Sequence, residues 1–182
     1  MTVAESSLAQ FQTDIDKWMA ENVPKNPGFL LPLTFLEVGT EQQLDFLRDW
    51  QHKLWQAGFL GMHWPTEYGG QGADPAYQGL VDKALTAHNA PIIFNTIGLN
   101  WTGPLLLDVG TEDDRKRYIK NILTGDDIWC QGFSEPDHGS DLGNVQTRAV
   151  RDGDEYVVNG SKVWTTLGNY ADHMILLART DT

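Results

Sequence analysis

The chain has 182 residues, of which 25 are acidic and 13 are basic, so its formal net charge at pH 7 is −12. Hydrophobic residues make up 41% and charged residues 21%, a ratio typical of folded globular proteins rather than disordered ones. The acidic balance argues against a general nucleic-acid binder and against a polybasic membrane-surface protein, because both need a basic face. The single cysteine, Cys130, excludes an internal disulfide and a Cys-rich zinc site, and it suits a reducing compartment.

The N-terminus has no basic region followed by an apolar run, so we expect no secretory signal. The longest stretch without an acidic or basic residue, 84–107, is interrupted by asparagines, threonines and prolines. That stretch is too polar for a helix that spans a membrane. We therefore expect a soluble, cytoplasmic protein.

Helix signals dominate residues 1–125. The first helix is predicted from apolar residues at helical spacing before Pro24: Leu8, Phe11, Ile15, Trp18 and Met19. Thr40 and Gln43 predict a capping box for a second helix that ends at Gly58. Its predicted inward residues are Leu44, Leu47, Trp50 and Leu54.

Three further helices are expected before residue 125. Asp74 and Pro75 have the pattern of an N-cap followed by an N1 proline, for a helix that runs towards His88. Pro91 is expected to begin a short apolar helix, and Gly103-Pro104 to break the chain again. Thr111 is expected to cap the last helix, whose inward residues are Tyr118, Ile119 and Ile122.

After Gly125 the period of the apolar residues changes from about 3.6 to 2, which indicates strands. Strands are predicted over residues 128–133, 145–151, 156–158, 162–167 and 174–178. Asp152-Gly153 predicts a turn, and Asn159-Gly160 predicts a hairpin between its flanking strands. The fold class is therefore α+β, with a helical domain over 1–125 and antiparallel strands over 126–182.

Several familiar sites are absent, including the phosphate-binding GxxxxGK[ST], the zinc motif HExxH and the CxxC pair. Gly69-Gly70-Gln71-Gly72 is glycine-rich, but no strand precedes it, so it predicts a tight turn. Residues 126–182 hold ten acidic and four basic residues. An anionic cofactor in this part would therefore depend mainly on backbone amides and hydroxyls.

Two segments could carry chemistry. Residues 134–141, SEPDHGSD, follow the first strand and could hold a phosphate or a flavin edge through backbone amides; the alternative is an Asx/Ser-rich turn. Residues 162–167, KVWTTL, would place Trp164 and Thr166 on one face of a strand. That face could pack a planar ring and bond its edge, or it could form a common aromatic–threonine pair between strands.

Together these segments resemble the acyl-CoA dehydrogenase family. The similarity lies in WCQGFSEPDHGS, DGDEYVVNGSKVWTT and MILLART, and, earlier in the chain, in GFLGMHWPTEYGGQG and GTEDDRKRYIKNILTGDDIWCQGFSEP. It covers residues from about 44 to 180. The resemblance implies a helical N-terminal domain followed by the first part of the middle β-domain, an incomplete antiparallel β-barrel.

The resemblance also implies FAD as the cofactor. The positions that match its binding segments are Gln131, Phe133, Ser134, Gly139, Ser140, Trp164, Thr165 and Thr166. Ser134 matches a hydroxyl at the pyrimidine side of the isoalloxazine, and Thr166 matches a residue towards flavin N5. Ser140 also matches a contact to the CoA part of the substrate. Because the family's cofactor site also uses groups from a later domain and a neighbouring subunit, the resemblance implies weak FAD binding by this chain.

The implied reaction is α,β-desaturation of an acyl-CoA thioester in acyl-CoA catabolism, an oxidoreductase acting on CH–CH groups. The base of that family is a glutamate in a later helical domain, so we expect no catalytic residue in this chain and no turnover by it alone. Glu135 precedes a proline in a turn and is expected to order the loop; Glu67 lies in another turn. Electron-transfer flavoprotein or a similar acceptor, and a homo- or hetero-oligomer, are the implied partners.

Three alternatives remain open at this stage. The protein could be an acyl-CoA oxidase that passes electrons to O₂, or a non-catalytic partner subunit of the same fold. Residues 92–101 resemble a wall of the acyl-chain pocket, but they could equally be ordinary helix packing.

His138 stands where the family often has a small residue, and Cys130 is expected to be a small buried strand residue.

Overall fold

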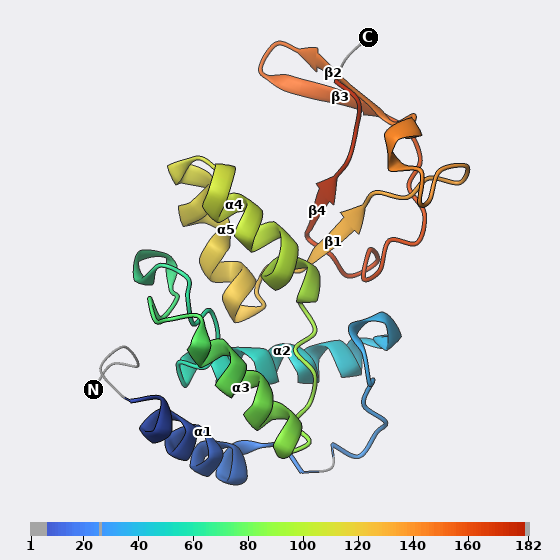
Figure 1. The fold of residues 1–182 in the computed structure, drawn as a ribbon. Coiled ribbons are helices and arrows are strands. Elements are labelled where there is room, and N and C mark those ends of the chain that lie inside the picture. The colour runs from blue at the N-terminus through green and yellow to red at the C-terminus, as the bar shows by residue number, and fades with distance from the viewer. Residues whose placement is uncertain (1–6, 26, 181–182) are drawn as a thin grey trace. The chain divides into compact units, whose positions relative to one another are not determined.

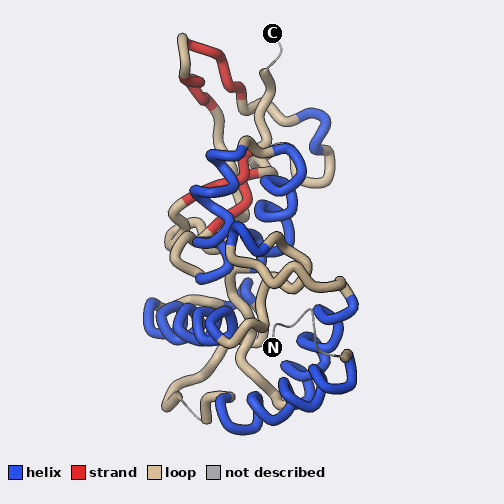
Figure 2. Tube along the Cα trace, turned by 90° about the vertical axis from the view of Figure 1, so that its left-hand side faces the viewer, coloured by secondary structure: helices blue, strands red, loops and turns tan. Residues whose placement is uncertain are grey.

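The computed structural model describes residues 7–25 and 27–180. It divides the chain into two compact units, one that ends at Asp127 and one that begins at Ile128. The first unit is built of helices and the second of short strands and loops (Figures 1 and 2), which confirms the expected fold class. The segment in which no secretory signal is expected falls partly on residues 1–6, outside the described residues.

The α-helices of the first unit are α1 (Leu8–Asn22), α2 (Glu41–Gln56), α3 (Ala76–Ala87), α4 (Gly103–Val109) and α5 (Glu112–Thr124). Helix α1 packs against α3, and α5 packs against both α2 and α4 (Figure 1). Within the described part of the chain, no helix combines the length and the apolar character needed to cross a membrane.

The predicted caps set the starts of three helices. Thr111 and Asp114 form a complete capping box at α5. At α2, Thr40 accepts a hydrogen bond from the Gln43 amide at 3.2 Å, but the Gln43 side chain accepts from Gly39 instead of from Thr40. The box predicted there is thus only half formed. Asp74 accepts from the Ala76 amide at 2.8 Å and caps α3, as expected.

The predicted core of the first unit is largely confirmed. All four inward residues predicted for α2 are buried, as are Phe11, Ile15 and Met19 of α1 and Ile119 and Ile122 of α5. Leu8, in the first turn of α1, is 47% exposed. Trp18 and Tyr118 are half-buried.

The prediction that Pro91 begins a helix and that Gly103-Pro104 ends it is wrong. Helical backbone begins at Thr96 and continues through Pro104 to Val109. A π-helical turn, η4 (Gly98–Thr102), precedes the proline, and the Gly103 amide donates to the Gly98 carbonyl five residues earlier. A proline inside an α-helix lacks the N–H donor and clashes with the carbonyl four residues back. The wider π turn shifts that carbonyl, so the helix can continue through Pro104.

The second unit contains two small sheets. Strands β2 (Arg148–Asp152) and β3 (Glu155–Asn159) form an antiparallel hairpin whose turn begins at Gly153, with φ of +63°. Strands β1 (Trp129–Gly132) and β4 (His173–Leu176) pair parallel, with Trp129 opposite His173. The antiparallel expectation is therefore confirmed for β2 and β3 and is wrong for β1 and β4, whose long connection permits a crossover.

The predicted hairpin at Asn159-Gly160 and the predicted strand over 162–167 are both wrong. A Cβ at Gly160 would collide with the Thr147 side chain, so this glycine serves a close approach and not a turn. Trp164 and Leu167 have φ of +58° and +62°, which no extended strand allows. The segment instead folds into tight turns, in which the Gly168 amide donates to the Thr165 carbonyl at 2.9 Å.

Candidate functional site

Strand β1 leads into a loop whose backbone is held in a tight turn. The amide of Glu135 donates to the carbonyl of His138 at 2.8 Å, and the amide of His138 donates back to the carbonyl of Glu135 at 3.1 Å. The turn between them consists of Pro136 and Asp137. This is the irregular backbone that the sequence predicts for residues 134–141.

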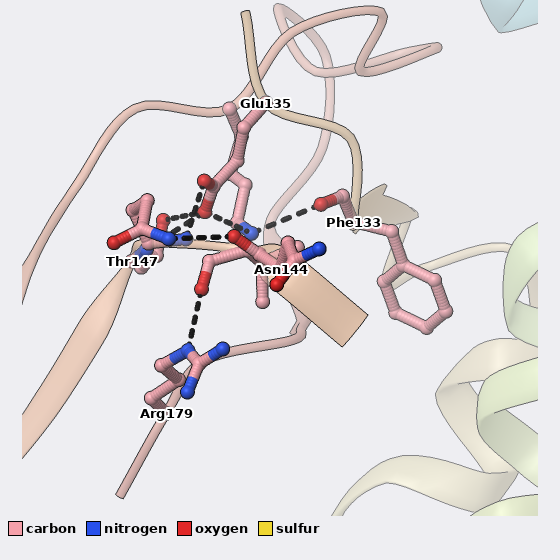
Figure 3. A network of polar contacts seen from close by, with 8 residues as sticks. Phe133, Glu135, Asn144, Thr147 and Arg179 are labelled. Atoms are coloured by element: carbon pink, nitrogen blue, oxygen red, sulfur yellow. Dashed lines mark hydrogen bonds and ion pairs between the residues drawn. The ribbon is translucent and has the colours of Figure 1, made fainter. Parts of the chain in front are cut away.

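A buried carboxylate organises this loop (Figure 3). Glu135 accepts hydrogen bonds from the Thr147 hydroxyl at 2.5 Å, the Thr147 amide at 2.8 Å and the Gln146 amide at 2.6 Å. The ammonium of Lys162 lies 2.9 Å from the same carboxylate. Glu135 thus orders the loop, as the sequence interpretation expects.

These contacts hold the pKa of Glu135 far below its ordinary range. The Thr147 hydroxyl contributes most, and the Gln146 amide and the Lys162 ammonium act in the same direction against the effect of burial. A carboxylate with so low a pKa is a poor proton acceptor at neutral pH. The geometry therefore agrees with a structural role for Glu135 and not with the role of a base.

Two cations of this unit are used inside the loop. Lys162 also donates to the Phe133 carbonyl at 3.0 Å. Arg179 donates to the Val145 carbonyl at 2.7 Å (Figure 3). It also donates to the Gly143 carbonyl at 2.9 Å. Sequence reasoning missed Lys162, Thr147 and Arg179 as loop-holding residues, since each acts on a partner more than ten positions away. The cations that remain in this unit are Arg148 and Arg151 of β2.

The predicted cofactor residues fall into two groups. Gln131 lies on β1, Phe133 and Ser134 follow it, and all three are half-buried. The amide of Val163 donates to the Ser134 carbonyl at 2.9 Å, which brings the segment that starts at Trp164 next to the end of β1. Gly139 and Ser140 lie beyond the turn and are exposed.

Trp164 is 89% exposed. It does not share a strand face with Thr166, contrary to the prediction, because residues 164–167 form a turn in which the Thr166 amide donates to the Trp164 carbonyl. Thr165 and Thr166 are half-buried. The turn leaves the indole ring open to the solvent within its own unit.

Four hydroxyl groups of this unit have no hydrogen-bond partner among the described residues: those of Ser134, Ser140, Thr165 and Thr166. A free aromatic plane can stack on a planar ring, and free hydroxyls can donate to nitrogen and oxygen atoms at its edge. The exposed backbone at Gly139 leaves room for an anionic group to approach its amide. This donor set fits a flavin.

The helical unit holds a cavity of about 280 Å³ between α3, the loop before η3 (Thr66–Tyr68) and the start of the helix that contains η4. Four residues of the predicted pocket wall, 92–101, line it: Ile93, Thr96, Leu99 and Asn100. The remaining lining residues come from the stretch 60–64 and from α3. This part of the segment therefore borders an open volume.

The geometry shows no catalytic or binding role for the remaining candidate residues. Cys130 is buried, and burial raises the pKa of its thiol, so it stays protonated. Glu67 is exposed beside Tyr68, whose hydroxyl donates to Glu112 at 2.6 Å. That bond raises the pKa of Tyr68 to about 12. Among residues 7–25 and 27–180, no cluster of His, Cys, Asp and Glu could hold a metal ion.

Comparison with known proteins places these features in one family. Residues 33–126 match the acyl-CoA dehydrogenase N-terminal domain, and residues 130–182 match the acyl-CoA dehydrogenase middle domain. Acyl-CoA dehydrogenase IpdE1 from Mycobacterium tuberculosis is 35% identical over 175 residues, which are 96% of this chain and 45% of that protein. The chain thus spans less than half the length of this relative.

Solved structures give the same result. In the ChsE4–ChsE5 complex from Mycobacterium tuberculosis, the matching chain is 30% identical with a TM-score of 0.75, and the match covers all of this chain and 44% of that one. A glutaryl-CoA dehydrogenase from Mycobacterium smegmatis in complex with FADH2 is 25% identical with a TM-score of 0.69, over 96% of this chain and 42% of that one. The helical unit, the loop after β1 and both domain matches together show that this chain belongs to the acyl-CoA dehydrogenase family.

Proposed function

We propose that this chain supplies the flavin-facing part of an FAD-dependent acyl-CoA dehydrogenase, which desaturates an acyl-CoA thioester between the α and β carbons. The observation that carries the proposal is the exposed Trp164 ring next to the ordered loop after β1, together with hydroxyls that have no partner in the described residues. The relative that was solved with FADH2 supports the choice of cofactor.

The residues proposed to hold FAD divide by chemistry. Trp164 would stack on the ring system, while Ser134, Thr165 and Thr166 would donate to its polar edge. Gly139 and Ser140 would offer an amide and a hydroxyl to the pyrophosphate, and Ser140 would also contact the CoA part of the substrate. Gln131 and Phe133 would line the site at the end of β1. FAD supplies the hydride acceptor for the reaction.

The role of the Glu135 network in this proposal is positional. The carboxylate fixes residues 146 and 147 through their amides, and Lys162 joins it to the Phe133 carbonyl, next to the proposed donor Ser134. Binding donors that are held before the ligand arrives lose less conformational entropy on binding. No catalytic base is proposed within this chain.

The partners proposed are an acyl-CoA substrate and an electron-transfer flavoprotein or a similar acceptor, with a cytoplasmic location. A second candidate function is favoured by one comparison: the ChsE4–ChsE5 structure is a complex of two named proteins. This chain could accordingly serve in a hetero-oligomer, as a subunit that completes a flavin site with a partner. The oxidase alternative has no structural observation in its favour.

The proposal is tested on the chain and on the full-length protein. The full-length protein should be yellow, with a flavin absorbance band, and should desaturate an acyl-CoA with an artificial electron acceptor. The 182-residue chain alone should bind FAD weakly and show negligible turnover. A full-length protein that never binds flavin would contradict the proposal, and turnover by the chain alone would contradict the absence of a base. Peroxide formed without added acceptor would favour the oxidase.

A further inference from the structure

Asn159 is the last residue of β3, and it is the one asparagine of the sequence that a glycine follows. Its side chain is exposed, and the carboxamide has no hydrogen-bond partner among the described residues. Strand β3 pairs with β2 alone in the described part of the chain. A two-stranded hairpin is marginally stable and opens readily at its ends. The carboxamide of Asn159 is therefore open to attack.

The backbone nitrogen of the next residue, Gly160, is an unhindered nucleophile. It has no hydrogen-bond partner in residues 7–25 and 27–180, and the residue is exposed. Because glycine has no side chain, nothing shields this nitrogen from Cγ of Asn159, and the backbone can rotate towards it. The two neighbouring residues thus combine an accessible electrophile with a free nucleophile.

Gly160 also touches the network that orders the loop after β1. A Cβ at Gly160 would collide with the side chain of Thr147, so the two residues approach each other closely. Thr147 donates to the carboxylate of Glu135 through both its amide and its hydroxyl. A change in the length of the backbone at Asn159 would therefore displace a direct neighbour of this network.

We propose that Asn159 is a site of spontaneous deamidation through a cyclic imide formed with Gly160. The Gly160 nitrogen loses its proton and bonds to Cγ of Asn159, while the bond between Cγ and Nδ2 breaks and Nδ2 leaves as ammonia. Water then opens the imide. Opening at Cγ leaves an aspartate, and opening at the backbone carbonyl leaves an isoaspartate. Nothing is oxidised or reduced, and water is the co-reactant.

The two products have different consequences for the hairpin. An aspartate places a carboxylate opposite Arg148, the cross-strand partner of Asn159, and opposite charges in that position are favourable. An isoaspartate runs the main chain through Cβ and Cγ, which adds one C–C bond of about 1.5 Å to the backbone. Since Gly160 packs closely on Thr147, the isoaspartate, and not the aspartate, loosens the contact between Thr147 and Glu135.

Peptide mapping of the 182-residue chain after incubation in mildly alkaline buffer tests the site, with an unincubated sample as the baseline. Trypsin releases residues 152–162, in which Asn159 has the one amide side chain. This peptide should gain about 1 Da as an amino group is replaced by a hydroxyl. The control is peptide 163–179, whose Asn169 is also exposed. There the following amide, that of Tyr170, donates to the Leu167 carbonyl at 2.8 Å, so this peptide should gain mass several-fold more slowly.

Two variants separate the site from its consequence. Asn159→Gln should abolish the gain in mass, because glutamine would have to close a larger ring. Asn159→Asp supplies the aspartate product without the isoaspartate. Hydrogen exchange at the Thr147 amide, which donates to Glu135 at 2.8 Å, should become faster in the incubated unmodified chain than in either incubated variant.

Three results would overturn these expectations. A peptide 152–162 that keeps its mass in the folded chain, whether or not it gains mass in urea, would show that Asn159 is not a deamidation site of the folded hairpin. Equal rates for peptides 152–162 and 163–179 would show that Gly160 gives no advantage. Unchanged exchange at Thr147 in a chain that has gained the mass would disconnect the site from the Glu135 network. The chemistry needs neither flavin nor acyl-CoA, so these results are independent of the proposed function.

Discussion

The ammonium of Lys162 lies 2.9 Å from the carboxylate of Glu135, although the two residues stand 27 positions apart. Both side chains are almost fully shielded, at 8% and 5% exposure. The same ammonium donates to the Phe133 carbonyl, so one cation fixes both the end of β1 and the turn that follows. The shape of the loop after β1 therefore depends on a residue from a distant part of the unit.

The Glu135 network should make the second unit sensitive to acid. The carboxyl pKa lies below its ordinary value of 4.5 in the folded chain, so the unfolded chain takes up the proton more readily. The stabilisation is then complete above pH 4.5 and is lost as the pH falls below it. Thr147→Val removes the largest cause of the shift and should lower the Tm at pH 7 more than at pH 3.

The matched control for this experiment is Thr13→Val in α1, whose hydroxyl donates to the Ala9 carbonyl and touches no carboxylate. Its effect on Tm should be the same at both pH values. If the Tm difference between Thr147→Val and the unmodified chain is likewise the same at both pH values, the carboxylate is not the group that the Thr147 hydroxyl stabilises.

Gln51 should be important for the stability of the helical unit. Its side chain is fully buried and donates to the carbonyls of Ile122 and Leu123 at 2.9 and 3.0 Å. Gln51→Leu leaves the Leu123 carbonyl at the end of α5 short of a donor, while the Ile122 carbonyl keeps the Asn95 side-chain amide at 3.2 Å. The loss costs about 1–3 kcal/mol in the free energy of unfolding. Urea unfolding measures it. Gln56→Leu, at the exposed end of α2, should change the free energy by less than about 0.5 kcal/mol.

Two glycines in helices should respond oppositely to alanine. A Cβ at Gly103 would collide with the indole of Trp64, whereas a Cβ at Gly79 meets nothing within 4 Å. Gly103→Ala should therefore destabilise the helical unit by about 1–3 kcal/mol through overpacking. Gly79→Ala should stabilise it by about 0.5–1 kcal/mol, because alanine loses less backbone entropy. Equal effects in urea unfolding would show that the contact between Gly103 and Trp64 is not tight.

The proposed stacking role of Trp164 can be measured in flavin binding. Trp164→Ala in the full-length protein should raise the Kd for FAD by roughly 2- to 10-fold, the value of one aromatic stacking contact. The reference is Trp101→Ala, which removes a tryptophan that is 45% exposed in the helical unit. The Trp101 variant should keep the flavin affinity. An unchanged Kd in the Trp164 variant would remove Trp164 from the proposed site.

Local sequence signals were sufficient for much of the helical unit. The caps at Thr111 and Asp74 and the inward residues of α2 follow from patterns within one or two turns. Gln51 could also have been found, since it occupies an inward position between Leu47 and Leu54. A polar residue at such a position indicates a buried hydrogen-bond partner elsewhere in the fold.

Long-range contacts limited the prediction of the second unit. The parallel pairing of β1 with β4 has no local signature, and the same holds for the contact between Glu135 and Lys162. Asn159-Gly160 misled the prediction because glycine serves two purposes, tight turns and close packing. At Gly160 the glycine is needed for its close approach to Thr147. Nothing in the residues next to Gly160 indicates that contact.

The π turn at Gly98–Thr102 has a consequence for the face of the helix that follows it. A π turn accommodates one residue more than an α-helical turn, and each α-helical residue rotates the helix by about 100°. The side chains of α4 thus point about 100° away from where an uninterrupted α-helix would direct them. Deleting one residue from η4 would restore the α-helical phase, and it would also bring Pro104 back into conflict with the carbonyl behind it.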